Sequence, residues 1–448
     1  MAASSTFAPA SVAKTVQAYP TKDFFVTMIT KDIALRDCIF DLLDNSIDGA
    51  HREAKSKGNG AYAGFEVRVT FDATRFSIGD NCGGITLDDA IHHAFHFGRK
   101  VGASNDVAGG IGLYGIGMKR AIFKIGRKCA ISSQASDAAF KVSVDVEAWK
   151  AKEEWDFEYE DIPRATEGRG TLIEIGELTD GARQLLGDPA FRNSLVKDMA
   201  RDYAFFIQKG LTVKVCDQPV PSYQYRLSSS ANLAPMVETY DDDGVAVRIL
   251  AGIADSIPDD VPEDLRPDKV ERLGWFIICN DRVVLAADKT ERTVWGNDGY
   301  NVWHGQYAGF AGYVFFNSAD QSKLPWNTTK RGIDLESPLY RRAVARMKSV
   351  TTEFIKYSQV RSGDLAEAKN AERQAQFVEI SQLRVPQPLR LPTLSAVAVR
   401  PSYSTISYQK PKTEIDEVRQ ELGSSRLTLP EVGRRTFEYY RRVELGKK

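Results

Sequence analysis

Three polar residues that could bind a metal ion and accept a proton recur one helical turn apart early in the chain. Asp41, Asn45 and Asp48 are spaced by four and three residues, which places their side chains along one face of a helix. Two carboxylates with an amide between them suit a divalent cation and a proton acceptor, and a polar solvated face is the alternative. The apolar residues between them fall on another face that we expect to be buried, namely Leu42, Leu43 and Ile47.

A second candidate is a carboxylate at the end of an expected strand. Asp80 is followed by Asn-Cys and then by Gly83 and Gly84. Such a carboxylate can accept a hydrogen bond from the exocyclic amine of adenine, and adjacent glycines let a base approach the backbone. An ordinary acidic turn is the alternative interpretation.

A glycine cluster before a helix is the third candidate. Gly112, Gly115 and Gly117 precede Lys119, so backbone N–H groups and a helix N-terminus could bind phosphate oxygens. A dinucleotide-binding turn would lie between the first strand and first helix of a βαβ unit, whereas here a helix precedes the first strand. No GxxxxGK[ST] motif occurs, so a P-loop is excluded.

These motifs require elements that hold them together, and the pattern predicts an α+β domain over residues 1–185 with helices on one mixed sheet. Glycine-rich residues 98–117 suit no regular element. The expected helices are 23–56, 87–97 and 119–125. The expected strands are 65–71, 75–78, 128–133, 139–147, 155–160 and 171–175.

A second α+β domain is expected over residues 186–360, followed by a helical tail over 361–448 that prolines interrupt. Residues 384–412 contain five prolines and no acidic residue, which is typical of an extended linker. The expected helices are 190–209, 338–357, 364–383, 414–422 and 431–445. The expected strands are 211–215, 245–253, 273–279, 282–285 and 311–316.

The order of the three motifs resembles that of the GHKL ATPases, which include gyrase, the ninety-kilodalton heat-shock chaperones, histidine kinases and MutL, with the MORC proteins beside them. In that superfamily ExxxN is followed by DxGxG, a mobile lid and GxxGxG. Here Asp41 with Asn45, Asp80 to Gly84, and Gly112 to Gly117 match in order. Thr171, after Gly170, matches a later Gly-Thr whose Thr supports the adenine-binding Asp.

The resemblance implies a Bergerat-type α/β sandwich that binds ATP and Mg²⁺. Asp41 would align or deprotonate the attacking water, and Asn45 would be the metal ligand. The residues expected to bind the nucleotide are Asn45, Asp48, Asp80, Gly84, Gly112, Gly115, Gly117, Lys119 and Thr171. Two positions depart from the pattern, since Asp41 is one methylene shorter than the usual Glu and Cys82 replaces a glycine.

The resemblance also implies that the second domain is a transducer, as in MutL, gyrase, the chaperones and MORC proteins. Such a domain supplies a lysine or another polar group to the γ-phosphate. The loop from residue 317 to 334 follows an apolar strand and carries three cations, and we expect Lys330 rather than Lys323 to act there. Asn280-Asp281-Arg282 resembles a transducer hairpin and otherwise forms a turn.

Composition narrows the class of protein. The 448 residues are 43% hydrophobic and 27% charged with a net charge of −1, which neither favours nor excludes nucleic acid. Five cysteines without a CxxC pair, and no apolar run long enough for a membrane span, predict a reduced, cytoplasmic protein. We expect His92, His93 and His96 to be exposed rather than metal-bound, and residues 241–244 to form an acidic turn rather than a calcium loop.

Two functions are compatible with the sequence. The first is an ATPase switch in which ATP orders the lid, docks the second domain through Lys330 and promotes a homodimer, acting on DNA or a protein complex. The alternative is a non-hydrolysing nucleotide-binding protein or a chaperone-like scaffold. Residues 434–442 of the tail interleave cations with aromatics, which could bind nucleic acid, although a docking helix is the simpler interpretation.

Overall fold

The computed structural model describes residues 20–54, 60–98, 108–112, 115–164, 168–254, 271–296, 299–327, 329–363, 365–394 and 406–446. The chain divides into two compact units, Met1–Ser395 and Ala396–Lys448. Residues 99–107, which cover most of the expected lid, and residues 113 and 114 of the third motif lie outside the described residues. No described helix is long and apolar enough to cross a lipid bilayer.

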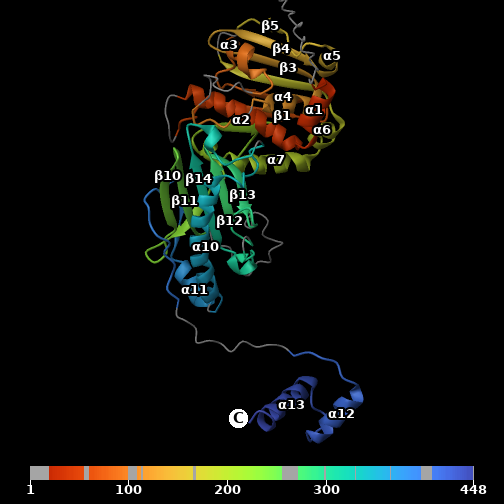
Figure 1. Cartoon of the computed structure of the whole chain (residues 1–448), viewed down its shortest axis with the longest axis vertical. Helices are drawn as coiled ribbons and strands as arrows, with labels where there is room; N and C mark the ends of the chain where they lie inside the picture. The colour runs from red at the N-terminus through yellow and green to blue at the C-terminus, as the bar shows by residue number, and fades with distance from the viewer. Residues whose placement is uncertain are drawn as a thin grey trace, which may run out of the picture. The chain divides into compact units, whose positions relative to one another are not determined.

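The first sheet has, within the described residues, eight strands in the order β5-β4-β3-β6-β2-β1-β7-β8 (Figure 1). It is mixed, as predicted, because β1 pairs in parallel with β7 while the other neighbouring pairs are antiparallel. The strands are β1 (Glu66–Phe71), β2 (Phe76–Asp80), β3 (Gly126–Gln134), β4 (Ala139–Asp145), β5 (Tyr159–Asp161), β6 (Gly170–Leu178), β7 (Thr212–Val215) and β8 (Gln218–Pro219).

Helices cover one face of this sheet (Figure 1). Along β1, Val67, Val69 and Phe71 are buried while Arg68 and Thr70 are exposed, because alternate residues of a strand point to opposite faces. The helices are α1 (Lys22–Lys31), α2 (Leu35–Glu53), α3 (Leu87–Asp89), the π-helical turn η1 (Ala90–Ala94), α4 (Gly117–Ile125), α5 (Val146–Ala151), α6 (Asp180–Leu186), α7 (Pro189–Asp202) and α8 (Ala204–Gln208).

Four local predictions for this region need correction. The strand expected over 155–160 is only β5 (Tyr159–Asp161). The single helix expected over 23–56 is two helices, because Ala34 is extended and caps the start of α2. The strand expected over 139–147 ends at Asp145, whose side chain accepts a hydrogen bond from the backbone N–H of Ala148 and caps α5. The sheet also extends past the boundary expected at residue 185, since β7 and β8 belong to it.

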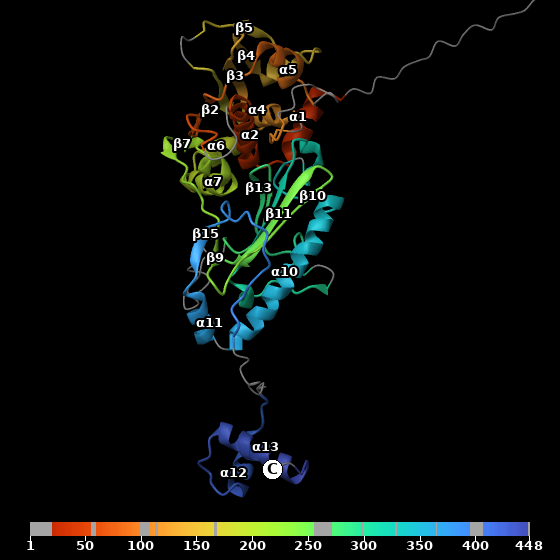
Figure 2. The same ribbon diagram turned by 90° about the vertical axis from the view of Figure 1, so that its left-hand side faces the viewer.

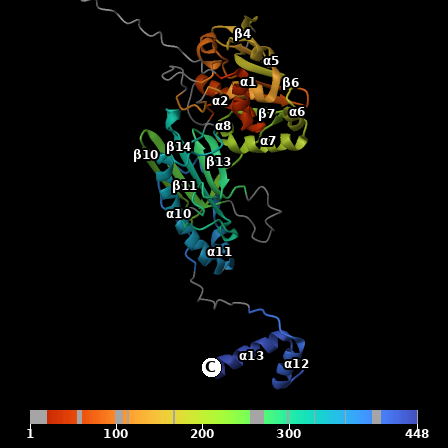
Figure 3. The same cartoon turned by 45° about the vertical axis from the view of Figure 1, so that its right-hand side comes forward.

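The second sheet has, in the described part of the chain, five strands in the order β10-β11-β14-β12-β13. Figure 2 shows α10 running along β11, which it contacts, and Figure 3 shows α7 where the two sheets meet, next to β13. The elements are β10 (Met236–Asp242), β11 (Val245–Ile253), β12 (Gly274–Cys279), β13 (Arg282–Asp288), β14 (Phe310–Asn317), α10 (Pro338–Gly363) and the 3₁₀ turns η4 (Gly305–Tyr307) and η5 (Gln321–Lys323).

The segment after α10 differs most from expectation. The helix predicted over 364–383 is wrong beyond α11 (Leu365–Glu372), because β15 (Gln376–Glu379) pairs with β9 (Arg226–Ser229) instead. The expected linker over 384–412 is also partly ordered, since Gln387 and Arg390 pair with the backbone at Val237 and Ala234. In the second unit, α12 (Lys412–Glu421) contacts α13 (Leu429–Val443).

Candidate functional site

A single pocket contains all of the residues that the sequence proposed as site residues. It is bounded by α2, the end of β2, the start of α4, the start of β6 and a loop of the second domain. The proposed residues that line it are Asp41, Asn45, Asp48, Asp80, Gly84, Gly112, Gly115, Gly117, Lys119, Thr171 and Lys330. Their spatial convergence is an observation, whereas the role of each residue stays a prediction.

The polar face of α2 is more deeply buried than its sequence indicated. Asn45 is exposed, but Asp41 and Asp48 are only 5% and 6% exposed, so neither carboxylate faces bulk solvent. Asp44, which the sequence analysis did not select, is 1% exposed. Its spacing was nevertheless informative, because Asp44 follows Asp41 by three residues and precedes Asp48 by four.

Asp80 is fixed at the end of β2 by three hydrogen bonds. Its Oδ2 accepts from the hydroxyl of Ser46 at 2.7 Å, and its Oδ1 accepts from the backbone N–H groups of Cys82 at 2.9 Å and Thr171 at 3.2 Å. Burial raises the pKa of this carboxyl, although these hydrogen bonds oppose the increase. Thr171 therefore supports Asp80 through its backbone.

Asp48 organises the loop that leads to α4. Its carboxylate accepts hydrogen bonds from the backbone N–H groups of Ile111 at 2.7 Å and Gly112 at 2.6 Å. A Cβ atom on Gly112 would lie 2.4 Å from Asp48 Oδ2, so a larger residue at this position would displace the carboxylate of Asp48. Asp48, predicted to contact the nucleotide, thus has both carboxylate oxygens bonded to the phosphate-loop backbone.

The remaining pocket glycines allow close approaches of the backbone. Gly84 has a φ of +76°, and a Cβ there would lie 2.2 Å from the carbonyl oxygen of Gln134. Gly117 begins α4 next to Asp41, whose Cβ and Cγ would lie 3.1 Å from an added Cβ. The first residues of α4, Gly117, Met118 and Lys119, line the pocket, and the N-terminus of a helix suits an anion.

Lys119 does not point freely into the pocket as a phosphate ligand would. It is buried, and its amine donates hydrogen bonds to the carbonyl oxygens of Ala94, at 2.9 Å, and Gly115. These bonds join η1, which leads into the lid segment, to the glycine loop. The contacts of Lys119 thus support the loop's shape, and its predicted contact with the nucleotide would require them to change.

Asp41 has an ion-pair partner that the sequence analysis missed. Arg120, also in α4, donates from Nη2 to Asp41 Oδ2 at 2.5 Å, and both residues line the pocket. Burial raises the pKa of Asp41, an effect that Lys330 and Arg120 oppose. The only sequence signal for Arg120 was a second cation directly after Lys119 at a helix start.

The second domain contributes Lys330 to the pocket. Its amine donates to Asp44 Oδ2 at 2.9 Å, and the residue is 6% exposed. Lys323, the other candidate, instead bonds to Asp243 at the β10–β11 turn. Burial lowers the pKa of Lys330, but Asp44 and Asp41 together outweigh burial and raise it above its ordinary value.

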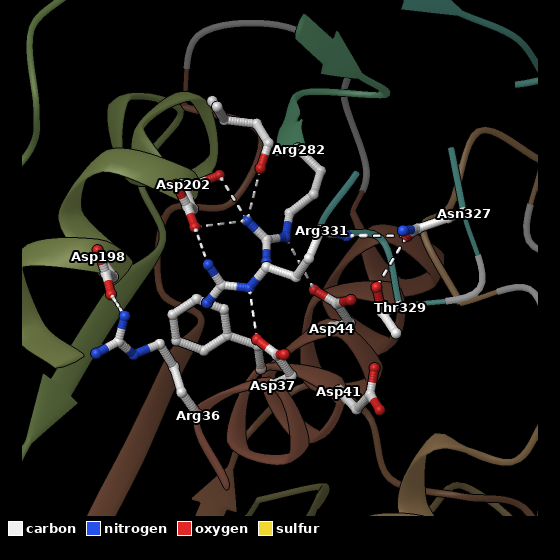
Figure 4. A network of polar contacts seen from close by, with 12 residues as sticks. Arg36, Asp37, Asp41, Asp44, Asp198, Asp202, Arg282, Asn327, Thr329 and Arg331 are labelled. Carbon is white, nitrogen blue, oxygen red and sulfur yellow. Dashed lines mark hydrogen bonds and ion pairs between the residues drawn. The ribbon is translucent and has the colours of Figure 1, made fainter. Parts of the chain in front are cut away.

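A polar network around Asp44 joins the two domains (Figure 4). Arg282 of β13 approaches Asp44 at 3.4 Å and Asp202 of α7 at 3.5 Å, with its guanidinium 4.0 Å from the Tyr203 ring centroid. Arg331 pairs with Asp37 of α2 at 2.8 Å and with Asp202 at 3.2 Å. The cations come from the second domain and their partners from the first, so these ion pairs cross the boundary between the two domains.

The Asn280 hairpin does more than turn the chain. Asn280 and Asp281 have φ values of 46° and 65°, as a tight two-residue hairpin turn requires. The side-chain amide of Asn280 donates to the carbonyl oxygens of Gly110 and Ser318, both at 3.0 Å. This hairpin therefore holds the base of the glycine loop from the side of the second domain.

Other expectations concern metal ligands and cysteines. The described residues contain no group of three or more His, Cys, Asp or Glu side chains that could hold a metal ion. Asp241–Gly244 forms the β10–β11 turn, with a hydrogen bond from the Gly244 N–H to Asp241. The five cysteines are free thiols, and His92, His93 and His96 line the pocket.

Comparison with known proteins agrees with this geometry. Residues 33–171 match the family described as "Histidine kinase-, DNA gyrase B-, and HSP90-like ATPase". The matched region runs from the residues just before α2 to Thr171 and so includes the three motifs and the support of Asp80. No curated protein matched the sequence. Residues 33–171 belong to the GHKL ATPase superfamily, whose ATP-binding α/β sandwich is the fold of this part of the chain.

Proposed function

We propose that this protein binds Mg-ATP in the pocket beside α2 and hydrolyses it to ADP and phosphate, with the nucleotide controlling contacts between its two domains. The observation that carries the proposal is that Lys330, from the second domain, lines the same pocket as Asp41 and Asn45. A residue from a second domain in a nucleotide pocket gives the ligand a direct route to domain movement.

The residues suit the parts of Mg-ATP. Asp80 is fixed at a strand end where it can accept a hydrogen bond from the adenine amine, and the glycine loop with the α4 N-terminus suits the phosphates. Asn45 is exposed and carries an amide oxygen that could bind Mg²⁺, which commonly takes one or two protein ligands alongside phosphates and water. Bound Mg²⁺ would neutralise charge on the phosphate oxygens.

Asp41 is the candidate proton acceptor for hydrolysis. A water oxygen would bond to the γ-phosphorus while the bond from that phosphorus to the β–γ bridging oxygen breaks, and ADP would leave with the bonding electron pair. Asp41 would take the proton from the water, and the raised pKa that burial gives this carboxyl favours its holding a proton. Lys330 would stabilise charge that develops on the phosphoryl group.

The proposed switch follows from the contacts of Lys330. ATP phosphates would compete with Asp44 for its amine, which would loosen one tie between the domains and permit a second arrangement. We infer a homodimer in the ATP state and a macromolecular partner, either DNA or a protein complex. A non-hydrolysing nucleotide-binding protein is the second candidate, because the short carboxylate of Asp41 is held by Arg120.

Calorimetric binding and phosphate release by the full chain test both candidates. Asn45→Ala should abolish Mg-ATP binding, while Asp41→Asn should keep binding and lower turnover by about 10² to 10⁴-fold, the usual range for general base catalysis. Lys323→Ala, outside the pocket, is the matched control. Normal Mg-ATP binding by Asn45→Ala would refute the site, and binding without turnover by the wild type would favour the second candidate.

A further inference from the structure

Arg120 is a buried cation of the pocket with more hydrogen-bond donors than partners. It is 7% exposed, lines the pocket and pairs through Nη2 with Asp41. Its Nε has no hydrogen-bond partner among the described residues and is itself shielded from solvent. A buried donor without a partner costs free energy, so a ligand that offered Arg120 a hydrogen-bond acceptor would be stabilised there.

The neighbours of Arg120 indicate which ligand could supply that acceptor. Arg120 lies three residues after Gly117, which begins α4 and is in close approach to Asp41. The helix terminus that suits a phosphate and the carboxylate that holds Arg120 are therefore adjacent. A terminal phosphate presents three charged oxygens, which a planar guanidinium can bind in a two-pronged manner.

The other pocket cations have different partners. Lys119 donates to two backbone carbonyl oxygens, and Lys330 pairs with Asp44. Arg120 alone, among these three cations, is paired with the carboxylate proposed to accept the proton from water. Its choice of partner therefore decides whether Asp41 has an oxygen available for that proton.

We propose that Arg120 exchanges partners when ATP binds, from Asp41 in the nucleotide-free protein to the terminal phosphate in the complex. This inference rests on the proposed function and names the residue that senses the terminal phosphate. ADP lacks that phosphate, so the Arg120–Asp41 pair persists in the ADP complex. The exchange releases Asp41 only when a triphosphate is bound, which links the proton acceptor to the presence of substrate.

The test is the affinity of the full chain for a non-hydrolysable ATP analogue, AMP-PNP, and for ADP, each with Mg²⁺ in a calorimeter. Arg120→Ala should weaken AMP-PNP binding by about 10- to 100-fold, the range for one hydrogen bond to a charged group. ADP affinity should change by no more than about twofold, and Arg120→Lys should recover part of the loss. Arg127→Ala, at a half-buried arginine on β3 that does not line the pocket, is the control and should change neither affinity.

Two further measurements keep the test decisive. Because Arg120→Ala leaves Asp41 buried and unpaired, the double variant Asp41→Asn with Arg120→Gln replaces the ion pair by a neutral amide pair, and it should show the same selective loss. An unchanged ratio of AMP-PNP to ADP affinity in this folded variant overturns the proposal. A wild type that binds neither nucleotide overturns the proposed function itself, and this inference with it.

Discussion

Replacing Lys330 by Met tests whether the ion pair between Lys330 and Asp44 connects the second domain to α2. The substitution keeps an unbranched apolar chain out to Cε and removes the amine that lies 2.9 Å from Asp44 Oδ2. Breaking a buried ion pair by removing one partner costs about 3 to 5 kcal/mol. Asp44 keeps Tyr203 at 2.8 Å and Arg282 at 3.4 Å, so we expect a loss near the lower limit, about 3 kcal/mol of unfolding free energy.

A double-mutant cycle with Asp44→Asn isolates the pair. The free energy of urea unfolding is measured for the wild type, the two single variants and the double variant, all without nucleotide. Residues in direct contact usually show coupling of about 0.5 to 3 kcal/mol, and we expect a value in the upper half of that range. Coupling below about 0.5 kcal/mol would refute the reasoning, because Lys330 would then not be bound to Asp44 in solution. Lys323→Met, at an exposed pair, should cost less than about 1 kcal/mol.

The pH dependence of the stability of Lys330→Met is an independent test of the Lys330–Asp44 pair. Burial alone would raise the pKa of Asp44, but Lys330 and Arg282 outweigh burial and hold it below the ordinary value of 3.8. A carboxyl whose pKa is lowered by folding contributes stability above its unfolded pKa and loses that stability as the pH falls through the folded value. Lys330→Met removes one of the cations, so acid unfolding should begin at a higher pH than in the wild type.

Three other predictions concern two glycines with positive φ, the Asn280 hairpin and the thiols. Gly84→Ala should destabilise the fold by more than about 2 kcal/mol in urea unfolding, whereas Gly60→Ala, also at positive φ but with open space, should cost only about 1 to 2 kcal/mol. Asn280→Gly keeps the turn but removes the hydrogen bonds to Gly110 and Ser318. Amide hydrogen exchange at residues 109–112 should therefore accelerate while strands β12 and β13 stay protected. Equal protection of residues 109–112 in the wild type and the variant would contradict this. Burial raises the pKa of the Cys38 thiol to about 12, and Cys82, Cys129 and Cys279 are also buried. Half-buried Cys216 should therefore react first with a thiol reagent in the native protein. Mass spectrometry of the labelled peptides would check this order.

Local patterns in the sequence predicted much of the first domain. Strands β1 and β2 were foreseen because their apolar residues alternate, and because the pairing of two strands joined by a short turn depends mainly on residues close in the sequence. The pocket was foreseen because three short motifs each have a local geometry, and their order along the chain matched a known arrangement. The edge of the sheet was missed because β7 pairs with β1 across a long stretch of chain, which no local pattern records.

The ion-pair partners of the acidic residues could not be predicted from local patterns in the sequence. Arg120 and Arg282 reach Asp41 and Asp44 from other elements, and an ion pair between distant segments leaves no periodic signal. Similarly, β15 was mistaken for the end of a helix, because four residues carry too little pattern to distinguish the two. The sequence thus identified the motif residues that line the pocket but missed Arg120, and the structure was needed to show what each of them bonds.

Those bonds give the acidic face of α2 a specific consequence for nucleotide binding. Asp41 holds α4 through Arg120, Asp44 holds the second domain through Lys330, and Asp48 holds the glycine loop through Gly112. The three carboxylates lie on successive turns of one helix, and each is bonded to a different part of the molecule. A triphosphate that attracts Arg120 and Lys330 would weaken two of these ties together, while Asp48, bonded to backbone N–H groups, would keep the loop in place. We therefore expect ATP to loosen the Arg120 and Lys330 contacts before those of Asp48. A side-chain cation can exchange a carboxylate for a phosphate, whereas the backbone N–H groups bonded to Asp48 can keep their partner.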